Sequence, residues 1–239
     1  MTERDKSTAI VGVVAGALLG IGIAVAGFAV AGGLSELRSG PSLVTVRGLS
    51  ERDVMADLAT WEIATQSNGS ELAAVQRKAD ADAAAVREFL GSHGFTPEEI
   101  QNRGSSVQQY FDSQRGQMNI TIRQRFLART QDVARMQKTF ADQAAMIRKG
   151  VAFDNERGSV VYSFTGLNDV KPEMIGEATR SARDAAEQFA KDSDTSVGGI
   201  RQATQGYFTI TGRDGDVGSG SDTPFQKLRV VTTVEFRLK

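Results

Sequence analysis

The chain has 239 residues, with 28 basic and 29 acidic side chains, no Cys and one His. The absence of Cys excludes a disulfide framework, thiolate-bound metals and a cysteine nucleophile, and one His excludes a metal site with several imidazole ligands. The near-balanced charge argues against a protein that binds nucleic acid through bulk charge. These exclusions remove most common enzyme classes.

The first predicted element is a transmembrane anchor at residues 8–34, which contain no charged side chain. About 20 apolar residues are enough to cross the hydrocarbon core of a membrane. The alternative is a cleaved secretory signal, because Ala29–Ala31 has the small-x-small form of a cleavage site. The apolar run before that site exceeds the usual signal length of about 7–15 residues, so the sequence favours an uncleaved anchor. Residues 1–7 form its N-terminal tail, and residues 35–42 form a linker.

The charges around this segment do not fix its orientation. Arg4 and Lys6 precede it, but Arg38, Arg47 and Arg52 follow it closely, so the positive-inside count is ambiguous. A short tail before the span and a long remainder after it are typical of a signal-anchor protein. We therefore expect an inner (cytoplasmic) membrane protein with one span and a C-terminal domain in the periplasm or outside the cell.

Three glycines in the predicted span, Gly12, Gly16 and Gly20, recur every fourth residue. This spacing places them on one helix face, where a second helix could approach closely. Chance spacing in a run rich in Ala and Gly is the alternative interpretation.

The remainder, residues 43–239, alternates between strand and helix periodicities and predicts one α+β domain. Most strands alternate apolar and polar residues, which indicates antiparallel or mixed sheets with one face in water and the other covered by amphipathic helices. A strand–strand–helix order at 43–92 recurs at 101–149 and predicts a structural near-repeat. Strands are expected at 43–49, 54–66, 101–112, 117–130, 159–165, 200–211 and 227–238; helices at 70–92, 131–149 and 172–192; and a capped turn at 96–99.

Three arginines on one predicted strand, Arg123, Arg125 and Arg129, project from the same face. One interpretation is a solvated sheet face. The other is a cationic stripe that meets acidic residues of a neighbouring subunit, or lipid head groups, because a guanidinium group binds carboxylates bidentately. We carry the three residues forward as a candidate interface.

No other pattern predicts a catalytic, cofactor-binding or metal site. His93 follows a predicted helix, where a basic group interacts favourably with the helix C-terminus. Residues 214–218 superficially resemble a calcium loop, but the twelfth position, Phe225, is not Glu. The sequence has no phosphate-loop, dinucleotide, serine-hydrolase or HExxH motif. Tyr207 and Phe208 fall on opposite faces of one predicted strand, so one of them should be exposed.

The order of these elements, together with several short motifs, resembles the SIMPL domain family, long catalogued as a domain of unknown function. The motifs are VTVRG at 44–48, DLA at 57–59, GFTPEEIQ at 94–101 and VQQY at 107–110. Ala56 departs from the family pattern, which has Pro before DLA. The resemblance covers about residues 43–239. It implies an envelope protein, relatives that assemble into rings or cages, a link to oxidative-stress tolerance, and no agreed catalytic residues.

We therefore expect a non-enzymatic, membrane-anchored envelope protein that self-assembles as a homo-oligomer. It would contact membrane lipid through residues 8–34 and use no cofactor, nucleic acid or identified small-molecule substrate. The alternative is a monomeric or dimeric membrane-tethered module that recruits a protein or a small ligand. An enzyme with an unrecognised site is the third hypothesis.

Overall fold

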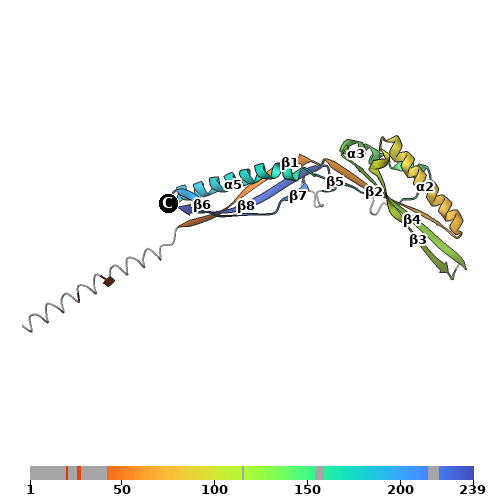
Figure 1. The fold of residues 1–239 in the computed structure, drawn as a ribbon, viewed down its shortest axis with the longest axis horizontal. Helices are drawn as coiled ribbons and strands as arrows, with labels where there is room; N and C mark the ends of the chain where they lie inside the picture. The colour runs from red at the N-terminus through yellow and green to blue at the C-terminus, as the bar shows by residue number, and fades with distance from the viewer. Residues whose placement is uncertain (1–19, 21–25, 28–41, 115, 154–158, 215–220) are drawn as a thin grey trace, which may run out of the picture. The chain divides into compact units, whose positions relative to one another are not determined.

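The computed structural model describes residues 20, 26–27, 42–114, 116–153, 159–214 and 221–239 (Figure 1). It has the predicted α+β class. The elements in chain order are β1 (Leu43–Met55), β2 (Leu58–Gly69), α2 (Leu72–Ser92), the 3-10 turn η1 (Pro97–Glu99), β3 (Ile100–Asp112), β4 (Gln117–Thr130), α3 (Val133–Ala141), α4 (Ala144–Arg148), β5 (Val160–Ser163), α5 (Leu167–Asp192), β6 (Val197–Gln205), β7 (Thr209–Gly212) and β8 (Phe225–Leu238).

The strands form two four-stranded sheets. The terminal sheet has the order β1-β8-β6, with β7 also paired to β8, and uses strands from both ends of residues 43–239. The central sheet has the order β3-β4-β2-β5. Its pairings are antiparallel, as is the pairing of β7 with β8. The expected near-repeat therefore holds in element order but not in space, because β1 and β2 belong to different sheets whereas β3 and β4 form a hairpin within one.

The described residues form two compact units. The first contains residues 42–46, 183–203 and 234–239. In it, the Leu238 N–H donates to the Ser42 carbonyl at 2.8 Å, and Arg183 lies over the Phe236 ring at 5.0 Å. The second contains residues 47–182 and 204–233, including the central sheet.

One face of the central sheet is covered by helices. α2 contacts β2 and β4, and α3 contacts β2 (Figure 1). Trp61 lies in this core and packs edge-to-face against Phe89 of α2 and Phe140 of α3. The alternating sequence pattern of β4 explains the layering, because Ile120, Ile122, Phe126 and Ala128 are buried.

Close backbone packing joins β1 to α5 in the second unit. A Cβ atom added at Gly48 would overlap the Ala178 carbonyl oxygen and the Ala182 nitrogen. Arg52 of β1 also forms ion pairs with Glu173 at 2.8 Å and Glu177 at 2.9 Å. Only a residue without a side chain allows the two backbones to approach this closely.

Several predicted boundaries are wrong. The expected helix 131–149 breaks at Asp142–Gln143 into α3 and α4. The break changes the phase of the last turn, so Met146 is buried and Ile147 is 56% exposed. The helix expected from residue 70 begins at Leu72 with Glu71 as its N-cap, and α5 begins five residues before Pro172, which lies inside it.

The predicted strands also need correction. β1 continues to Met55, across the expected loop at 50–53. The expected strand 200–211 is interrupted between β6 and β7, where Gly206 lies against β8 and its N–H donates to the Val231 carbonyl at 2.8 Å. Tyr207 is 95% exposed, and Phe208 packs with the cluster around Met174, so the expectation that one of the pair is exposed is confirmed.

Most of the predicted anchor lies outside the described residues. That includes the tail 1–7, Gly12 and Gly16, nearly all of 8–34, and the linker 35–42 apart from Ser42. In the described part of the chain, no helix has the length and apolar character needed to span a membrane.

Candidate functional site

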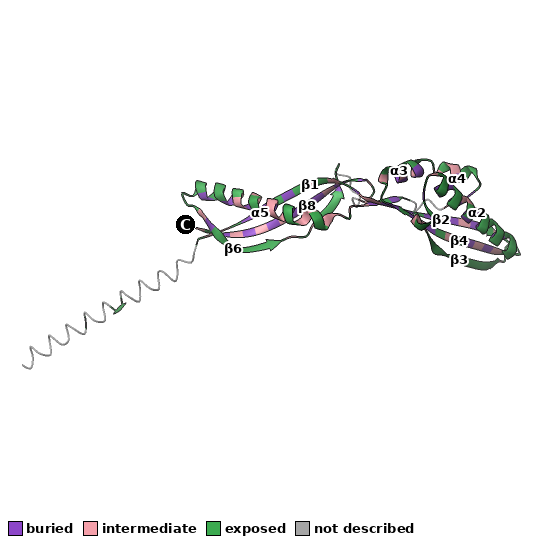
Figure 2. Cartoon of the chain, turned by 45° about the horizontal axis from the view of Figure 1, so that its top comes forward, coloured by how far each residue is buried: buried purple, intermediate pink, exposed green. Residues whose placement is uncertain are grey.

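The central sheet has a second face, which no described helix covers. We call this the open face and define it by Thr60, Glu62, Ala64, Gln66 and Asn68 of β2 and by Thr121, Arg123, Arg125, Leu127 and Arg129 of β4. Buried and outward-facing residues alternate along both strands (Figure 2). The alternation gives the sheet one apolar face and one polar face.

The three predicted interface arginines all lie on the open face and are exposed. Arg123 pairs with Gln66, Arg125 with Ala64 and Arg129 with Thr60 across the β2–β4 ladder. The Arg123 Nε donates to Gln66 Oε1 at 3.0 Å. The structure therefore confirms that these residues share one exposed face, while the partner of that face stays a prediction.

Positive charge dominates the open face. β2 and β4 contribute three arginines to it and one carboxylate, Glu62, which lies opposite Leu127. Among the described residues, none of these arginines forms an ion pair within 4.0 Å. Solvated guanidinium groups held at fixed spacing by a sheet can bind carboxylate or phosphate groups.

A cavity of about 370 Å³ adjoins the end of β4. It is lined by Leu58, Glu98, Glu99, Gln101, Arg129, Thr130, Gln131, Asp132 and Arg135. Arg129 belongs to both the cavity and the open face. The lining carries both signs of charge, which suits a small zwitterionic or polar ligand better than an apolar one.

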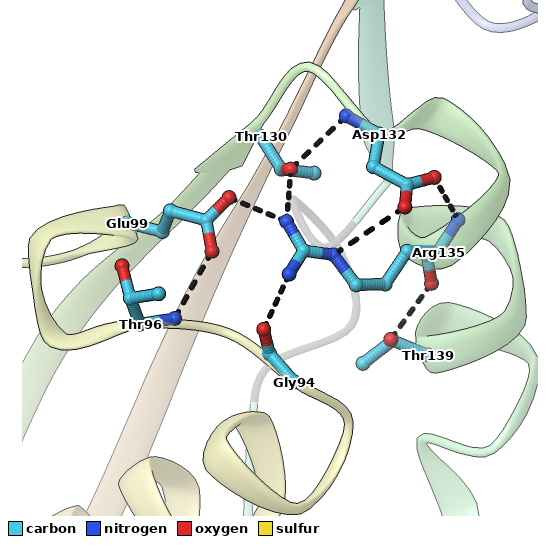
Figure 3. A network of polar contacts seen from close by, with 7 residues as sticks. All are labelled: Gly94, Thr96, Glu99, Thr130, Asp132, Arg135 and Thr139. Atoms are coloured by element: carbon cyan, nitrogen blue, oxygen red, sulfur yellow. Dashed lines mark hydrogen bonds and ion pairs between the residues drawn. The ribbon is translucent and has the colours of Figure 1, made fainter.

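Arg135 organises the wall of this cavity (Figure 3). Its guanidinium group donates to the carboxylate of Glu99, the hydroxyl of Thr130 and the carbonyl of Gly94, and it lies over the Phe95 ring at 4.7 Å. The Arg135 backbone N–H donates to the capping carboxylate of Asp132 at 2.9 Å. This one side chain links the end of β4 to the segment between α2 and β3.

Nearby hydrogen bonds and charge lower the pKa values of the two carboxyl groups of η1, Glu98 and Glu99. Burial alone would raise the pKa of Glu99, but the Thr96 N–H, the Thr130 hydroxyl and the Arg135 guanidinium together lower it from its ordinary value. The Thr96 hydroxyl similarly lowers the pKa of Glu98. Both effects favour the charged form of these carboxylates, of which Glu99 is the one paired with Arg135. The capping box at Thr96–Glu99 confirms the capped turn expected from the sequence.

A second polar cluster lies under α2. The Ser67 hydroxyl donates to Asp82 at 2.9 Å, and the Lys78 ammonium group bridges Asp82 and the Gly150 carbonyl. Ser67 and Asp82 are both buried. A serine, a lysine and a carboxylate could support acyl transfer, but a substrate cannot reach a hydroxyl closed inside the sheet–helix layer. The cluster fixes the position of α2 on β2.

The remaining sequence candidates are placed as follows. His93 caps α2, with its Nδ1 2.9 Å from the Phe89 carbonyl and its Nε2 3.3 Å from Asp142. Gly20 is described, exposed and in open space, but its two predicted neighbours in the helix face, Gly12 and Gly16, lie outside the described residues. No three His, Asp or Glu side chains converge as metal ligands in the described ranges.

Sequence reasoning missed the roles of Arg135 and β3. The sequence shows the capping box but contains no signal for the residue that binds its glutamate from 36 positions away. It also predicts β3 as an ordinary strand, whereas β3 is an edge strand exposed along nearly its whole length.

A family model described as "SIMPL: Protein of unknown function (DUF541)" matches residues 44–236. No curated protein matches the chain.

Proposed function

The chain belongs to the SIMPL family, and we propose that it is a membrane-anchored, self-assembling envelope protein with a structural role and no enzymatic one. The observation that carries this proposal is the open face, on which Arg123, Arg125 and Arg129 are exposed on a sheet surface that no described helix covers. Arginine is favoured at protein interfaces because its planar group binds carboxylates bidentately. Closed symmetry would repeat such contacts around an assembly.

Anchoring is the second part of the proposal. Residues 8–34 hold the chain in the inner (cytoplasmic) membrane, in contact with lipid, and place residues 43–239 on the periplasmic or outer side. The uncharged run of 27 residues supports this arrangement because it is long enough to span the hydrocarbon core. A part in stress tolerance, which the family resemblance implies, belongs to the same proposal.

The experiment that tests the proposal is a mass measurement on the full chain, purified in mild detergent, by light scattering. We expect a protein mass that is a multiple of the 25.6 kDa chain mass. A monomer at tens of micromolar would contradict self-assembly. Carbonate extraction of membranes tests the anchor separately, and release of the intact chain into the soluble fraction would contradict it.

The cavity beside Arg135 favours a second candidate, a membrane-tethered module that binds a small ligand. Arg129, Glu98 and Asp132 line the cavity together, so a compound with one carboxylate and one ammonium group could meet both signs of charge. A monomeric chain whose unfolding temperature rises with such compounds would favour this function over assembly.

A further inference from the structure

The outer edge of β3 is open to pairing. β3 is the first strand of the central sheet and pairs with β4 alone among the described strands. Its 13 residues are exposed apart from the two at its ends, which are half-buried (Figure 2). Val107 is 50% exposed and Phe111 is 62% exposed. A long edge strand of this kind presents unpaired N–H and C=O groups to any second strand.

The usual protections of an edge strand are confined to the two ends of β3, and Asp112 is its last residue. The register shifts between Asn102 and Gly104, which marks a β-bulge, and Arg103 lies within it. From Ser105 to Phe111 the sequence is SSVQQYF, seven residues without a charge or a proline. Charges, prolines and bulges are the devices that keep edge strands apart, so this segment is unprotected.

We propose that β3 pairs antiparallel with β3 of a second copy of this chain, with Gln109 opposite its own counterpart. The inference deepens the assembly proposed above and rests on it. In this register Val107 faces Phe111 of the second copy, and the contact occurs twice by symmetry. A register centred on Val107 would instead place Phe111 opposite the bulge at Arg103.

The apolar pairs would continue an existing core. Val107, Gln109 and Phe111 pair with Ile122, Ile120 and Met118 of β4. Ile120 and Ile122 are buried against Val75 and Ala79 of α2. The two copies of Val107 and Phe111 therefore extend the covered face of the central sheet beyond the reach of α2.

Charge complementarity on the open face favours the same partner. Ser106 pairs with Arg123, and the proposed register places Asp112 of the second copy opposite Ser106. Arg123 and that aspartate then share one row across three strands, about 10 Å apart at the backbone. The small Ser106 side chain lets the long arginine reach across it. Asp112 also accepts a hydrogen bond from the Gln114 N–H at 3.0 Å, which fixes its carboxylate at the strand end.

A single-cysteine experiment tests this pairing, because the chain has no Cys of its own. The full chain with Gln109→Cys is oxidised in mild detergent and run on a non-reducing gel. Residues opposite each other in antiparallel strands have Cα atoms about 4.5–5.5 Å apart, within the range that a disulfide bridges. The matched control is Ser105→Cys, exposed on the same strand and face but about 27 Å from its counterpart in this register. We expect at least a tenfold excess of covalent dimer from Gln109→Cys over Ser105→Cys.

Each other outcome overturns the inference in a recognisable way. Equal cross-linking of the two variants would indicate random collision, and cross-linking of Ser105→Cys alone would indicate another register. An oligomer by light scattering without a Gln109→Cys dimer would overturn β3 pairing but leave self-assembly standing. A monomer by light scattering would contradict both.

A second variant tests the pairing without a covalent bond. Gln109→Glu conserves the shape of an exposed side chain and places two carboxylates opposite each other. Like charges at opposed positions weaken strand pairing. We expect assembly about two- to fivefold weaker at neutral pH, with recovery when the carboxylates are protonated. Unchanged assembly at both pH values would count against the register.

Discussion

Arg135, in the first turn of α3, donates a hydrogen bond to the carboxylate of Glu99, 36 positions earlier in the chain. The same guanidinium group also binds Gly94 and Thr130, so a single side chain holds three segments together. The side chains of Arg135 and Glu99 are 26% and 22% exposed, so water screens their attraction only in part. This pairing fixes the wall of the cavity and the start of β3.

Replacing Arg135 should destabilise the domain. Arg135→Met conserves much of the aliphatic stem but removes charge-assisted hydrogen bonds and leaves Glu99 half-buried without its cation. We expect a loss of about 2–3 kcal/mol in the free energy of unfolding. Urea unfolding followed by fluorescence of Trp61, the single Trp, would measure it. The control Arg148→Met removes a 69%-exposed group whose ion pair to Asp142 is 3.6 Å long, so it should change stability by less than about 1 kcal/mol.

Glu99 should contribute to the acid sensitivity of the fold. Its folded-state pKa lies below the ordinary carboxyl value of 4.5, so its stabilising effect is present above about pH 4.5 and is lost as the pH falls through the folded-state pKa. Glu99→Gln should therefore reduce the loss of stability between about pH 5 and pH 3 in urea titrations. The same pH dependence of stability in Glu99→Gln and in the unmodified chain would contradict the role of Glu99.

Gly48→Ala should be among the most damaging single substitutions. The added Cβ would overlap backbone atoms of Ala178 and Ala182, and backbone cannot move aside as a flexible side chain can. We expect a loss of about 3 kcal/mol in urea unfolding. Gly199→Ala in β6 is the matched control, because nothing lies within 4 Å of its added Cβ. Its effect should stay within about 0.5 kcal/mol.

Charge reversal on the open face should weaken assembly. If Arg123 and Arg125 meet carboxylates of a neighbouring copy, Arg123→Glu with Arg125→Glu converts attraction into repulsion. In a dilution series followed by light scattering, the variant should dissociate at a protein concentration at least tenfold higher than the unmodified chain does. The double control Arg77→Glu with Lys138→Glu makes the same charge change at exposed positions on α2 and α3. Equal effects in both pairs would indicate a general charge effect and no specific interface.

The predicted transmembrane segment should make a smaller contribution to assembly. Association of helices in lipid lacks the hydrophobic driving force that acts in water, so a face of small residues adds modest stability. Gly16→Ile should therefore leave most of the oligomer intact in mild detergent. The protein concentration at which the oligomer dissociates should change by less than tenfold. Deletion of residues 1–34 should leave an oligomer in solution. A monomeric truncated chain would show that the segment carries the assembly.

Local sequence patterns correctly predicted those elements whose tertiary surroundings favour the same structure as the local pattern does. The strand at 117–130 was predicted with its observed bounds because its alternation of apolar and polar residues continues to both ends. The helix at 131–149 was predicted without its break, because the burial of Met146 depends on a core cluster whose other members come from distant segments of the chain. The shared face of Arg123, Arg125 and Arg129 follows from the two-residue repeat of side-chain direction along a strand. By contrast, the edge position of β3 and the partners of Arg135 depend on strand order and on contacts between distant segments.

The order of strands in the terminal sheet has a consequence for the time course of folding. β8 is its central strand, pairing with β1 on one side and with β6 and β7 on the other, and it is the last strand of the chain to be synthesised. β1 is the first of these strands to leave the ribosome. It has no strand to pair with in its sheet until about 180 further residues have followed. The central sheet draws its strands from one continuous stretch, 58–163, and can close much earlier. Pairings of such long sequence separation form slowly and leave strand edges open to wrong partners. During that interval β1 has no partner strand in its sheet, and loss of β8 by premature termination would leave the edge of β1 permanently unpaired.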